Sequence, residues 1–309
     1  MTQAPTPTAD TVRRLVRSLI EDGTAGAGGP EIRPASPGAD PTTWLVGARH
    51  VLRLAPDREA AVRQRRELRL RELVRPHVPV AVPTSVAHGE WAPGLTYSLD
   101  TRMPGAPGTE NKVSAIGEAD LSGLLTGLHQ ISVRQAETLG VPRAAPRSLE
   151  ALRRIAEGAA ARLAAADEFD AERLRQLTRP AAVQLGAQPS APVLVHHALT
   201  GDHLVVSADG RVRGVLGWDG TVVGDPAEDI AGLALAVGSP AAVRAATLAG
   251  YGARPCLRGL WLARCDAITR LAARLDGQGT TPLPVLRTWL RNAWEAILLE
   301  RVSDGDPEP

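Results

Sequence analysis

The chain has 309 residues, of which 44% are hydrophobic, and its 35 basic side chains nearly balance its 34 acidic ones. These values fit a folded protein of one or two domains and exclude a disordered, collagenous or coiled-coil chain. A net charge of +1 gives no general attraction to nucleic acids or anionic membranes, so we expect neither as a partner. The sequence has no apolar run of about 18 residues and its start, MTQAPTPTAD, has no signal-peptide core, which predicts a cytoplasmic protein.

The first hundred residues favour a small sheet with helices added to it. Apolar residues recur at helical spacing near the N-terminus and along an arginine-rich segment that Pro76 closes. Short apolar runs bounded by turn-forming residues predict strands between and after these helices. The predicted helices are residues 10–22 and 59–74, and the predicted strands are residues 43–47, 50–54, 78–82 and 91–102.

From residue 119 onward the pattern is that of amphipathic helices. Two short β-runs within residues 193–216, joined by a turn at Ala208-Asp209-Gly210, interrupt it once. We expect helices around Leu121 to Leu128, over 149–185, over 226–237 and onward to 302, with breaks at Gly238, Gly252 and 277–284.

This pattern predicts a β-rich lobe over 1–103, a helical lobe over 104–302 and a disordered tail over 303–309. Cys256 and Cys265 are expected to be buried thiols. Three tryptophans of the helical lobe are expected in its core, namely Trp261, Trp289 and Trp294.

One segment carries a recognisable motif. It begins at Val193 and reads VLVHHALTGDHLVVSADGRVRGVLGWDGTVVGDPAEDIAGL. It resembles the catalytic and metal-binding segment of the aminoglycoside and macrolide phosphotransferases, whose pattern is H-G-D, four residues, Asn or His, a hairpin, D-W and G-D-P-x-x-D. The resemblance implies a two-lobed, α+β, protein-kinase-like fold with a cleft near residues 103–107. The macrolide branch is favoured by His203 and by the run VLR.

The resemblance extends to the first hundred residues. The run VLRLAP is similar to the family's ATP-contacting strand, Glu67 falls where a helix glutamate belongs, and Met103-Pro104-Gly105 resembles the hinge. These matches imply a nucleotide cleft formed by Arg53, Glu67 and Met103. Arginine keeps its charge and can bind Glu67 and an oxyanion together. An ordinary surface ion pair between Arg53 and Glu67 is the alternative.

Two positions depart from the family pattern. The aspartate that aims the acceptor hydroxyl would lie two residues after the motif histidine, where this chain has Ala198. The metal-binding aspartate would precede the motif tryptophan, where this chain has Gly217. Phosphoryl transfer depends on these carboxylates and on magnesium ions. The changes predict that conventional phosphoryl transfer is lost and that binding of ATP with Mg²⁺ is weak or absent.

A shift of the alignment does not restore either aspartate. The spacings from the motif histidine to His203, and from Trp218 to the G-D-P segment, are those of the family. The nearest carboxylates are Asp202 and Asp219. Either aspartate could take the missing role only if its loop were rearranged. Otherwise its carboxylate would point across the strand, away from the phosphates.

The residues that remain suggest other chemistry. Candidate acid or base residues are His197, which replaces the motif glycine, together with His196 and His203. A transition metal could use His203 with Asp225. The competing interpretation is structural: His196 braces the loop, His203 is the macrolide-branch variant of asparagine, and Asp225 and Asp229 cap the next helix.

Three functions are compatible with this sequence. The first is a kinase-fold protein that has lost phosphoryl transfer and binds a small molecule or peptide, in specialised-metabolite biosynthesis or as the inactive partner of a modifying enzyme. The second is a repurposed enzyme whose histidines and arginines catalyse addition or cyclisation. The third is an active antibiotic-type O-phosphotransferase with an unorthodox site. Fold analogy does not choose among them.

Overall fold

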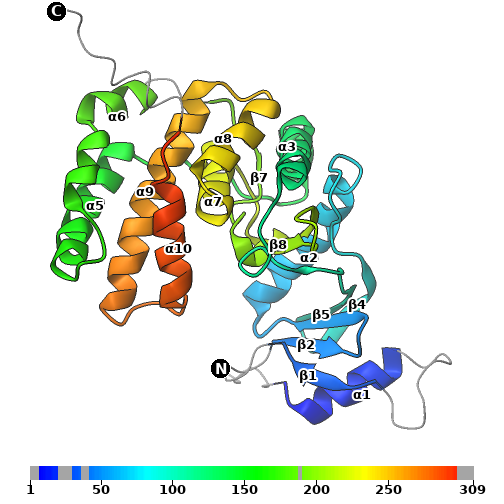
Figure 1. Cartoon of the computed structure of the whole chain (residues 1–309). Helices are drawn as coiled ribbons and strands as arrows, with labels where there is room; N and C mark the ends of the chain where they lie inside the picture. The colour runs from blue at the N-terminus through cyan, green and yellow to red at the C-terminus, as the bar shows by residue number, and fades with distance from the viewer. Residues whose placement is uncertain (1–6, 20–29, 36–41, 187–189, 298–309) are drawn as a thin grey trace, which may run out of the picture.

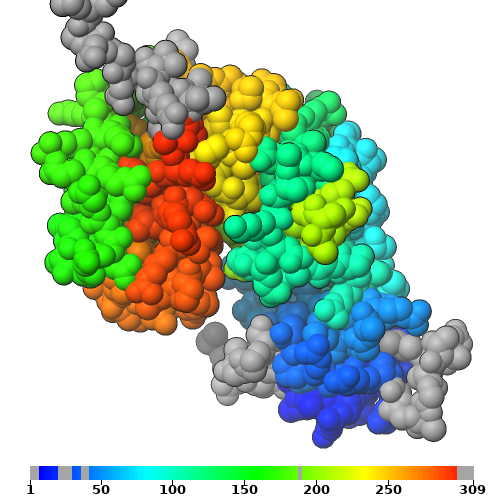
Figure 2. Space-filling model, viewed as in Figure 1, coloured from blue at the N-terminus to red at the C-terminus, as the bar shows by residue number. Residues whose placement is uncertain are grey.

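The computed structural model describes residues 7–19, 30–35, 42–186 and 190–297 and shows two lobes (Figure 1). The small lobe is an antiparallel sheet of five described strands in the order β1-β2-β3-β5-β4, with two helices. In Figure 2 the blue part of this lobe lies below the large lobe. Its elements are α1 Ala9–Leu19, β1 Ile32–Pro34, β2 Thr43–Val46, β3 His50–Leu54, α2 Arg58–Val74, β4 Ser85–Ala92 and β5 Leu95–Thr101.

The large lobe is mainly helical, as the sequence predicts. Its centre is formed by α7 and α9, and a hairpin of β8 and β9 lies beside it with a turn at Gly210, whose φ is +78°. Its strands are β6 Ala106–Pro107, β7 Val193–Val195, β8 Leu204–Val206, β9 Val212–Val215 and β10 Val222–Gly224. Its helices are α3 Ala115–Gln130, α4 Val133–Thr138, α5 Leu149–Ala165, α6 Arg179–Gly186, α7 Ala227–Val237, α8 Ser239–Leu248, α9 Ala253–Leu275 and α10 Leu283–Ala293, with short 3₁₀ turns η1 Ala171–Gln176, η2 Gly201–His203 and η3 Trp218–Gly220.

The buried apolar side chains form two main clusters, and the larger one also includes Leu70 and Val74 of α2. One buried cluster joins α1 to one face of the small sheet through residues such as Val16 and Trp44. A larger cluster fills the helical lobe. Cys256 and Cys265 are buried and unlinked, as predicted, and Trp261, Trp289 and Trp294 are buried. Within the described residues, no helix combines the length and the apolar character that a bilayer crossing requires.

The prediction of a single strand over 91–102 is wrong. The structure has two strands, β4 and β5, which pair antiparallel on either side of a turn. This turn contains Pro93 and Gly94, and Gly94 has a φ of +76°. Glycine adopts this left-handed conformation at little cost. Trp91 and Ala92, at the start of the predicted strand, therefore belong to β4, and only Leu95–Thr101 forms β5.

The prediction of a strand over 78–82 is also wrong. Residues in this stretch form only an isolated bridge, between Ala81 and Gly214 of β9. Pro79 and Pro83 flank the bridge, and proline has no N–H to donate to a ladder. The segment therefore runs between α2 and β4 and contacts the large lobe, with the Ala81 N–H donating to the Arg213 carbonyl at 2.9 Å.

The predicted long helical region over 149–185 is divided into α5, η1 and α6. It breaks after α5, where Asp167 has a φ of +57°, and Asp170 caps the following 3₁₀ turn by accepting from the Glu172 N–H. The predicted helix over 10–22 is described as far as Leu19. The last residues of that prediction, and the predicted tail over 303–309, lie outside the described residues.

Candidate functional site

A cavity of about 440 Å³ lies between the two lobes. Strands β2 and β3, the chain segment after β5, and the loops around η2 and η3 supply its walls. The residues that matter for its chemistry are Arg53, Asp100, Met103, Asp202, His203, Gly217 and Asp219. The cavity therefore brings together several residues that the sequence analysis selected separately.

The small-lobe wall contains the predicted pair of Arg53 and Glu67. Arg53 Nη1 donates to Glu67 Oε1 at 2.8 Å, and the Glu67 side chain is only 1% exposed, so this pair is not a surface contact. Burial opposes the charged form of Glu67, but Arg53 and Arg71 together lower its pKa below the usual value. The buried carboxylate is thus held ionised by two guanidinium groups.

Arg71 is a member of this network that the sequence analysis missed. Its side chain is buried, bonds Glu67 on the same helix, and donates from Nη1 to Asp100 Oδ2 at 3.0 Å. Asp100 also accepts from the Ser85 hydroxyl. The i, i+4 spacing of Glu67 and Arg71 on α2 is a signal that could have suggested the contact. The partner on β5 depends on tertiary packing.

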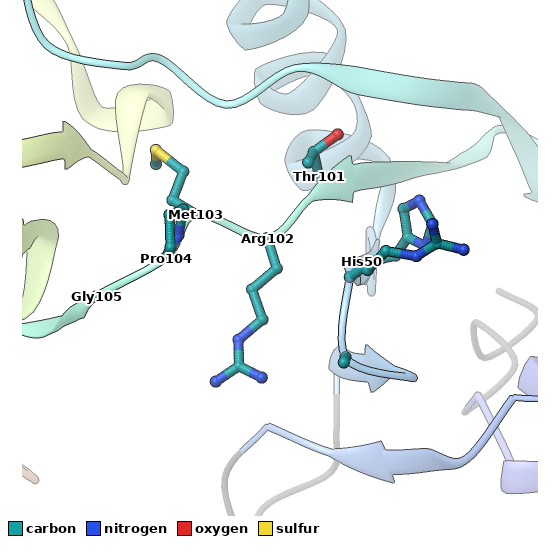
Figure 3. Close-up of a pocket in the computed structure, with 8 residues that line it drawn as sticks. His50, Thr101, Arg102, Met103, Pro104 and Gly105 are labelled. Atoms are coloured by element: carbon teal, nitrogen blue, oxygen red, sulfur yellow. The ribbon is translucent and has the colours of Figure 1, made fainter.

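Met103 lies on the chain segment between the lobes, as predicted for the hinge. It lines the cavity, and its Sδ packs so closely on Gly214 that a Cβ there would lie 2.2 Å from the sulfur. A second hollow, of about 420 Å³, adjoins it and is lined also by His50 and Arg102 (Figure 3). Figure 3 shows the Met103 and Arg102 side chains pointing in opposite directions.

His196 braces the loop that begins the large-lobe wall. Its backbone N–H donates to Asp229 Oδ2 at 2.8 Å, and its ring Nε2 lies 2.9 Å from the Leu216 carbonyl, to which it can only donate. The ring is fully buried with its edge against Trp218, at 4.6 Å between centroids. Burial, with a smaller contribution from His203, lowers the pKa of His196 to about 3. The imidazole is therefore neutral near pH 7 and holds the loop in place.

Asp229 receives two adjacent backbone donors. Besides His196, the His197 N–H donates to Asp229 Oδ1 at 2.8 Å. Burial raises the pKa of Asp229 to about 7, although the two N–H donors act in the opposite direction. Asp229 thus fixes the loop on α7 and has no contact with the cavity between the lobes.

His197 is exposed and has a φ of +70°. Residues other than glycine rarely adopt this left-handed conformation, although histidine is among those enriched there. The family pattern has glycine at this position, which such a backbone favours. Ala198 follows, half-buried, and its carbonyl lies 2.6 Å from His203 Nδ1. His197 does not line the cavity between the lobes.

The His203 ring packs against Gly217. Gly217 has a φ of +80°, and a Cβ at that position would lie 2.5 Å from His203 Cδ2 and 2.7 Å from Nε2. The imidazole therefore occupies the room into which a side chain at position 217 would project. Because His203 Nδ1 faces a carbonyl oxygen, that nitrogen carries the proton and Nε2 is the unprotonated atom in the neutral ring.

Asp225 does not face the cavity. Its carboxylate pairs with Arg258, both groups being buried, and Oδ1 accepts the Ala227 N–H at 3.0 Å. Arg258 also donates to the Arg147 carbonyl at 2.7 Å. Arg258 is a second residue that the sequence analysis missed, because its partner lies 33 positions away.

These positions do not fit a magnesium site of the family type. Gly217 supplies no oxygen, Asp225 is held by Arg258, and His203 is a nitrogen donor, whereas Mg²⁺ prefers oxygen ligands. Within the described part of the chain, no group of three or more His, Cys, Asp or Glu residues is placed to hold a metal ion.

Asp202 and Asp219 both line the cavity. The Asp202 carboxylate accepts from the Thr109 hydroxyl at 3.4 Å, and Asp219 is fixed through its carbonyl, which accepts from Arg66 at 2.8 Å. Burial lowers the pKa of the Arg53 guanidinium, but Glu67, with smaller contributions from Asp100 and Asp219, raises it above the usual value. Asp202 and Asp219 are the carboxylates that remain near the positions lost at 198 and 217.

Together, the antiparallel small lobe, the helical lobe and the cavity between them define a kinase-like fold. The profile of the "Phosphotransferase enzyme family" matches residues 31–260, and the chain belongs to this family. No curated protein matched the chain.

Solved structures of similar fold carry the same lobes. The GDP complex of wild-type aminoglycoside 2'-phosphotransferase-IIIa has a TM-score of 0.63 and 16% identity, over 95% of this chain and 98% of that one. The macrolide 2'-phosphotransferase MphH from Brachybacterium faecium, as apoenzyme, has a TM-score of 0.60 and 20% identity, over 92% and 99%. A macrolide 2'-phosphotransferase type I has a TM-score of 0.58 and 17% identity, over 93% of this chain and 98% of that one.

Proposed function

We propose that this phosphotransferase-family protein has lost conventional Mg²⁺-dependent phosphoryl transfer and uses the cavity between its lobes to bind a small molecule or peptide. The observation that carries the proposal is the position of His203. Its ring lies in the space into which a side chain at position 217 would project, so an aspartate there would require this ring to move. This packing supports the proposed loss of the metal site.

The missing base supports the same conclusion. A positioned acid or base group contributes about 10² to 10⁴ in rate, and the methyl group of Ala198 can neither accept nor orient a hydroxyl proton. Phosphoryl transfer relies mainly on positioning and on electrostatic stabilisation by metal ions. Without the base and without a bound metal ion, the cavity has neither of the groups by which this family of reactions is accelerated.

The cavity retains what binding needs. Its volume of about 440 Å³ is within the range of small-molecule sites. Arg53 uses one nitrogen for Glu67, and its side chain is 27% exposed, so its other donors can contact an acidic group of a ligand. Such a protein would present a bound substrate to a separate modifying enzyme, which suits specialised-metabolite biosynthesis.

The direct test measures nucleotide binding and phosphate transfer. We expect calorimetry with ATP to show weak binding that does not strengthen when Mg²⁺ is added, because no carboxylate is placed to hold the ion. We also expect no transfer of labelled γ-phosphate to a panel of macrolides and aminoglycosides. Stoichiometric transfer that stops when Arg53 is changed to Met would contradict the proposal.

Reversion variants provide a matched control. The double variant Ala198→Asp with Gly217→Asp restores both carboxylates, but His203 still occupies the space beside position 217. Adding His203→Asn frees that space. We expect only the triple variant to gain Mg²⁺-dependent nucleotide affinity, by about tenfold or more. An equal gain in the double variant would show that His203 does not block the site.

A second candidate function is an unorthodox phosphotransferase, because Asp202 and Asp219 line the same cavity as Arg53. This alternative requires transfer activity in the unmodified protein. Asp219→Asn would abolish that activity, whereas Asp209→Asn, on the exposed turn of the β8–β9 hairpin, would leave it unchanged.

A further inference from the structure

The large lobe contains a second cavity, of about 830 Å³, that shares no lining residue with the one between the lobes. It lies where η1 and α6 face the first half of α9 and the residues after α10. In Figure 1, α6 is at the end of the large lobe remote from the sheet. Its volume is within the range of sites that enclose most of a small organic molecule.

The described walls of this cavity carry positive charge and no acidic side chain. The four arginines are Arg173, Arg175, Arg254 and Arg264. Arg173 has no carboxylate partner in the described part of the chain; its Nη2 donates to the Trp294 carbonyl at 2.7 Å. A carbonyl satisfies the donor but does not neutralise the guanidinium. Arg175 pairs at 2.6 Å with Glu172, which is not part of the wall.

Trp294 adds an unused hydrogen-bond donor to this wall. Its side chain is 3% exposed, and its Nε1 has no acceptor among the described residues. The guanidinium groups of Arg173 and Arg264 lie 5.2 Å and 5.1 Å from the ring centroid. By contrast, Trp261 Nε1 in the same cavity donates to the Leu149 carbonyl at 3.3 Å. An unpaired buried N–H is unfavourable, and a ligand oxygen would satisfy it.

We infer that this cavity binds a carboxylate carried on an apolar or aromatic body. The carboxylate would accept from the Trp294 indole and from Arg173, because a guanidinium binds carboxylates in a forked geometry. The apolar body would lie against Leu185, Leu257 and Trp261. The inference is separate from the function proposed for the cavity between the lobes, since it uses none of the same residues.

The carboxylate can come from two sources. One is a free organic acid. The other is the chain itself, because residues 298–309 follow Ile297, which lines the cavity, and contain Glu300, Asp304, Asp306 and Glu308. Both sources supply the same chemistry, and a comparison of variants separates them.

The experiment uses naphthoate and its neutral amide, naphthamide, as probes of the full-length protein. Trp294→Phe removes the indole N–H and identifies the Trp294 signal in NMR spectra of nitrogen-labelled protein. We expect naphthoate to move that signal downfield, as a new hydrogen bond does, and to bind at least about tenfold more tightly than naphthamide by calorimetry.

The arginine variants decide which side chain recognises the acid. Arg173→Gln should weaken naphthoate binding about tenfold, while Arg291→Gln, an exposed arginine of α10 outside the cavity, should have no effect. Melting temperatures show that both variants fold. Equal affinity for acid and amide, an unmoved Trp294 signal, or an Arg173→Gln variant that binds as the unmodified protein does would each overturn the inference.

A full-length variant distinguishes the two sources of the carboxylate. Glu300→Gln, Asp304→Asn, Asp306→Asn and Glu308→Gln together neutralise residues 298–309 apart from the chain terminus. If the chain supplies the carboxylate, this variant binds naphthoate more tightly and has a Trp294 signal further upfield before any probe is added. If the ligand is free, affinity and signal match those of the unmodified protein.

Discussion

The two walls of the interlobe cavity have changed in different ways. The small-lobe wall retains the arginine–glutamate pair that the family resemblance implies and embeds it in a buried network with Arg71 and Asp100. The large-lobe wall retains its brace, in which Asp229 holds the loop of His196, but has Ala198 and Gly217 where carboxylates would act. Groups that maintain the fold are therefore separable from groups that perform the chemistry.

The largest expected effect is on the small-lobe network. Arg71→Met removes the guanidinium that pairs with both Glu67 and Asp100. Two buried carboxylates then have less positive charge beside them. We expect the free energy of unfolding to fall by about 3–5 kcal/mol. Chemical denaturation of the variant and of the unmodified protein measures the difference.

Arg53→Met is the matched control for that prediction. Arg53 is partly exposed, and Glu67 keeps Arg71 when Arg53 is removed, so we expect a loss of only about 1 kcal/mol. Equal losses for the two variants would contradict a network centred on Arg71. Weaker binding of acidic ligands by Arg53→Met, with little loss of stability, would assign this arginine to the cavity's function.

The next effect concerns the large-lobe brace and its pH dependence. The pKa of His196 is lowered in the fold to about 3 from an ordinary 6.5, so folding favours the neutral ring. Its stabilising contribution is complete above pH 6.5 and is lost as the pH falls toward 3. Near pH 4 the contribution of His196 to the free energy of unfolding is about 3 kcal/mol smaller than above pH 6.5.

His196→Gln isolates this contribution, because glutamine can still donate to the Leu216 carbonyl but does not titrate. Asp229 acts in the opposite direction: its pKa is raised to about 7 from 3.8, so its contribution is present below pH 3.8 and lost as the pH rises through 7. Because Asp229 is present in both proteins, subtracting their stabilities removes its contribution. A pH-independent difference between them would mean that His196 does not titrate with folding.

The smallest expected effect is at His197. His197→Gly restores a residue that adopts a φ of +70° without steric cost, and we expect a gain of up to about 1 kcal/mol, measured by thermal unfolding. If His197 only fills space, the variant keeps ligand binding and the formation of any pathway product. Loss of product formation in a stable variant would instead support the repurposed-enzyme hypothesis, with His197 as its acid or base.

Much of the architecture is predictable from local pattern. The helical spacing over 59–74 and the β-hairpin over 43–54 correspond to α2 and to β2 with β3. The predicted strands over 78–82 and 91–102 are wrong because prolines remove ladder donors and Gly94 turns the chain. Helix ends within 149–185 were missed because Ala, Leu and Arg favour helix over most of this stretch. The segments are separated by the left-handed backbone of Asp167 and by capping from Asp170 and Thr178.

The sequence by itself determined the kinase-like fold, the identity of the residues at 198 and 217, and the pairing of Arg53 with Glu67, because motif spacing fixes which positions face the cleft. Tertiary structure alone decided that Arg71 joins Glu67 to Asp100, that Arg258 holds Asp225, and that His203 occupies the space beside Gly217. Apart from the i, i+4 pair of Arg71 and Glu67 within α2, each of these contacts joins residues on different elements. Their side chains meet only when packing brings the elements together, and no local periodicity records that meeting.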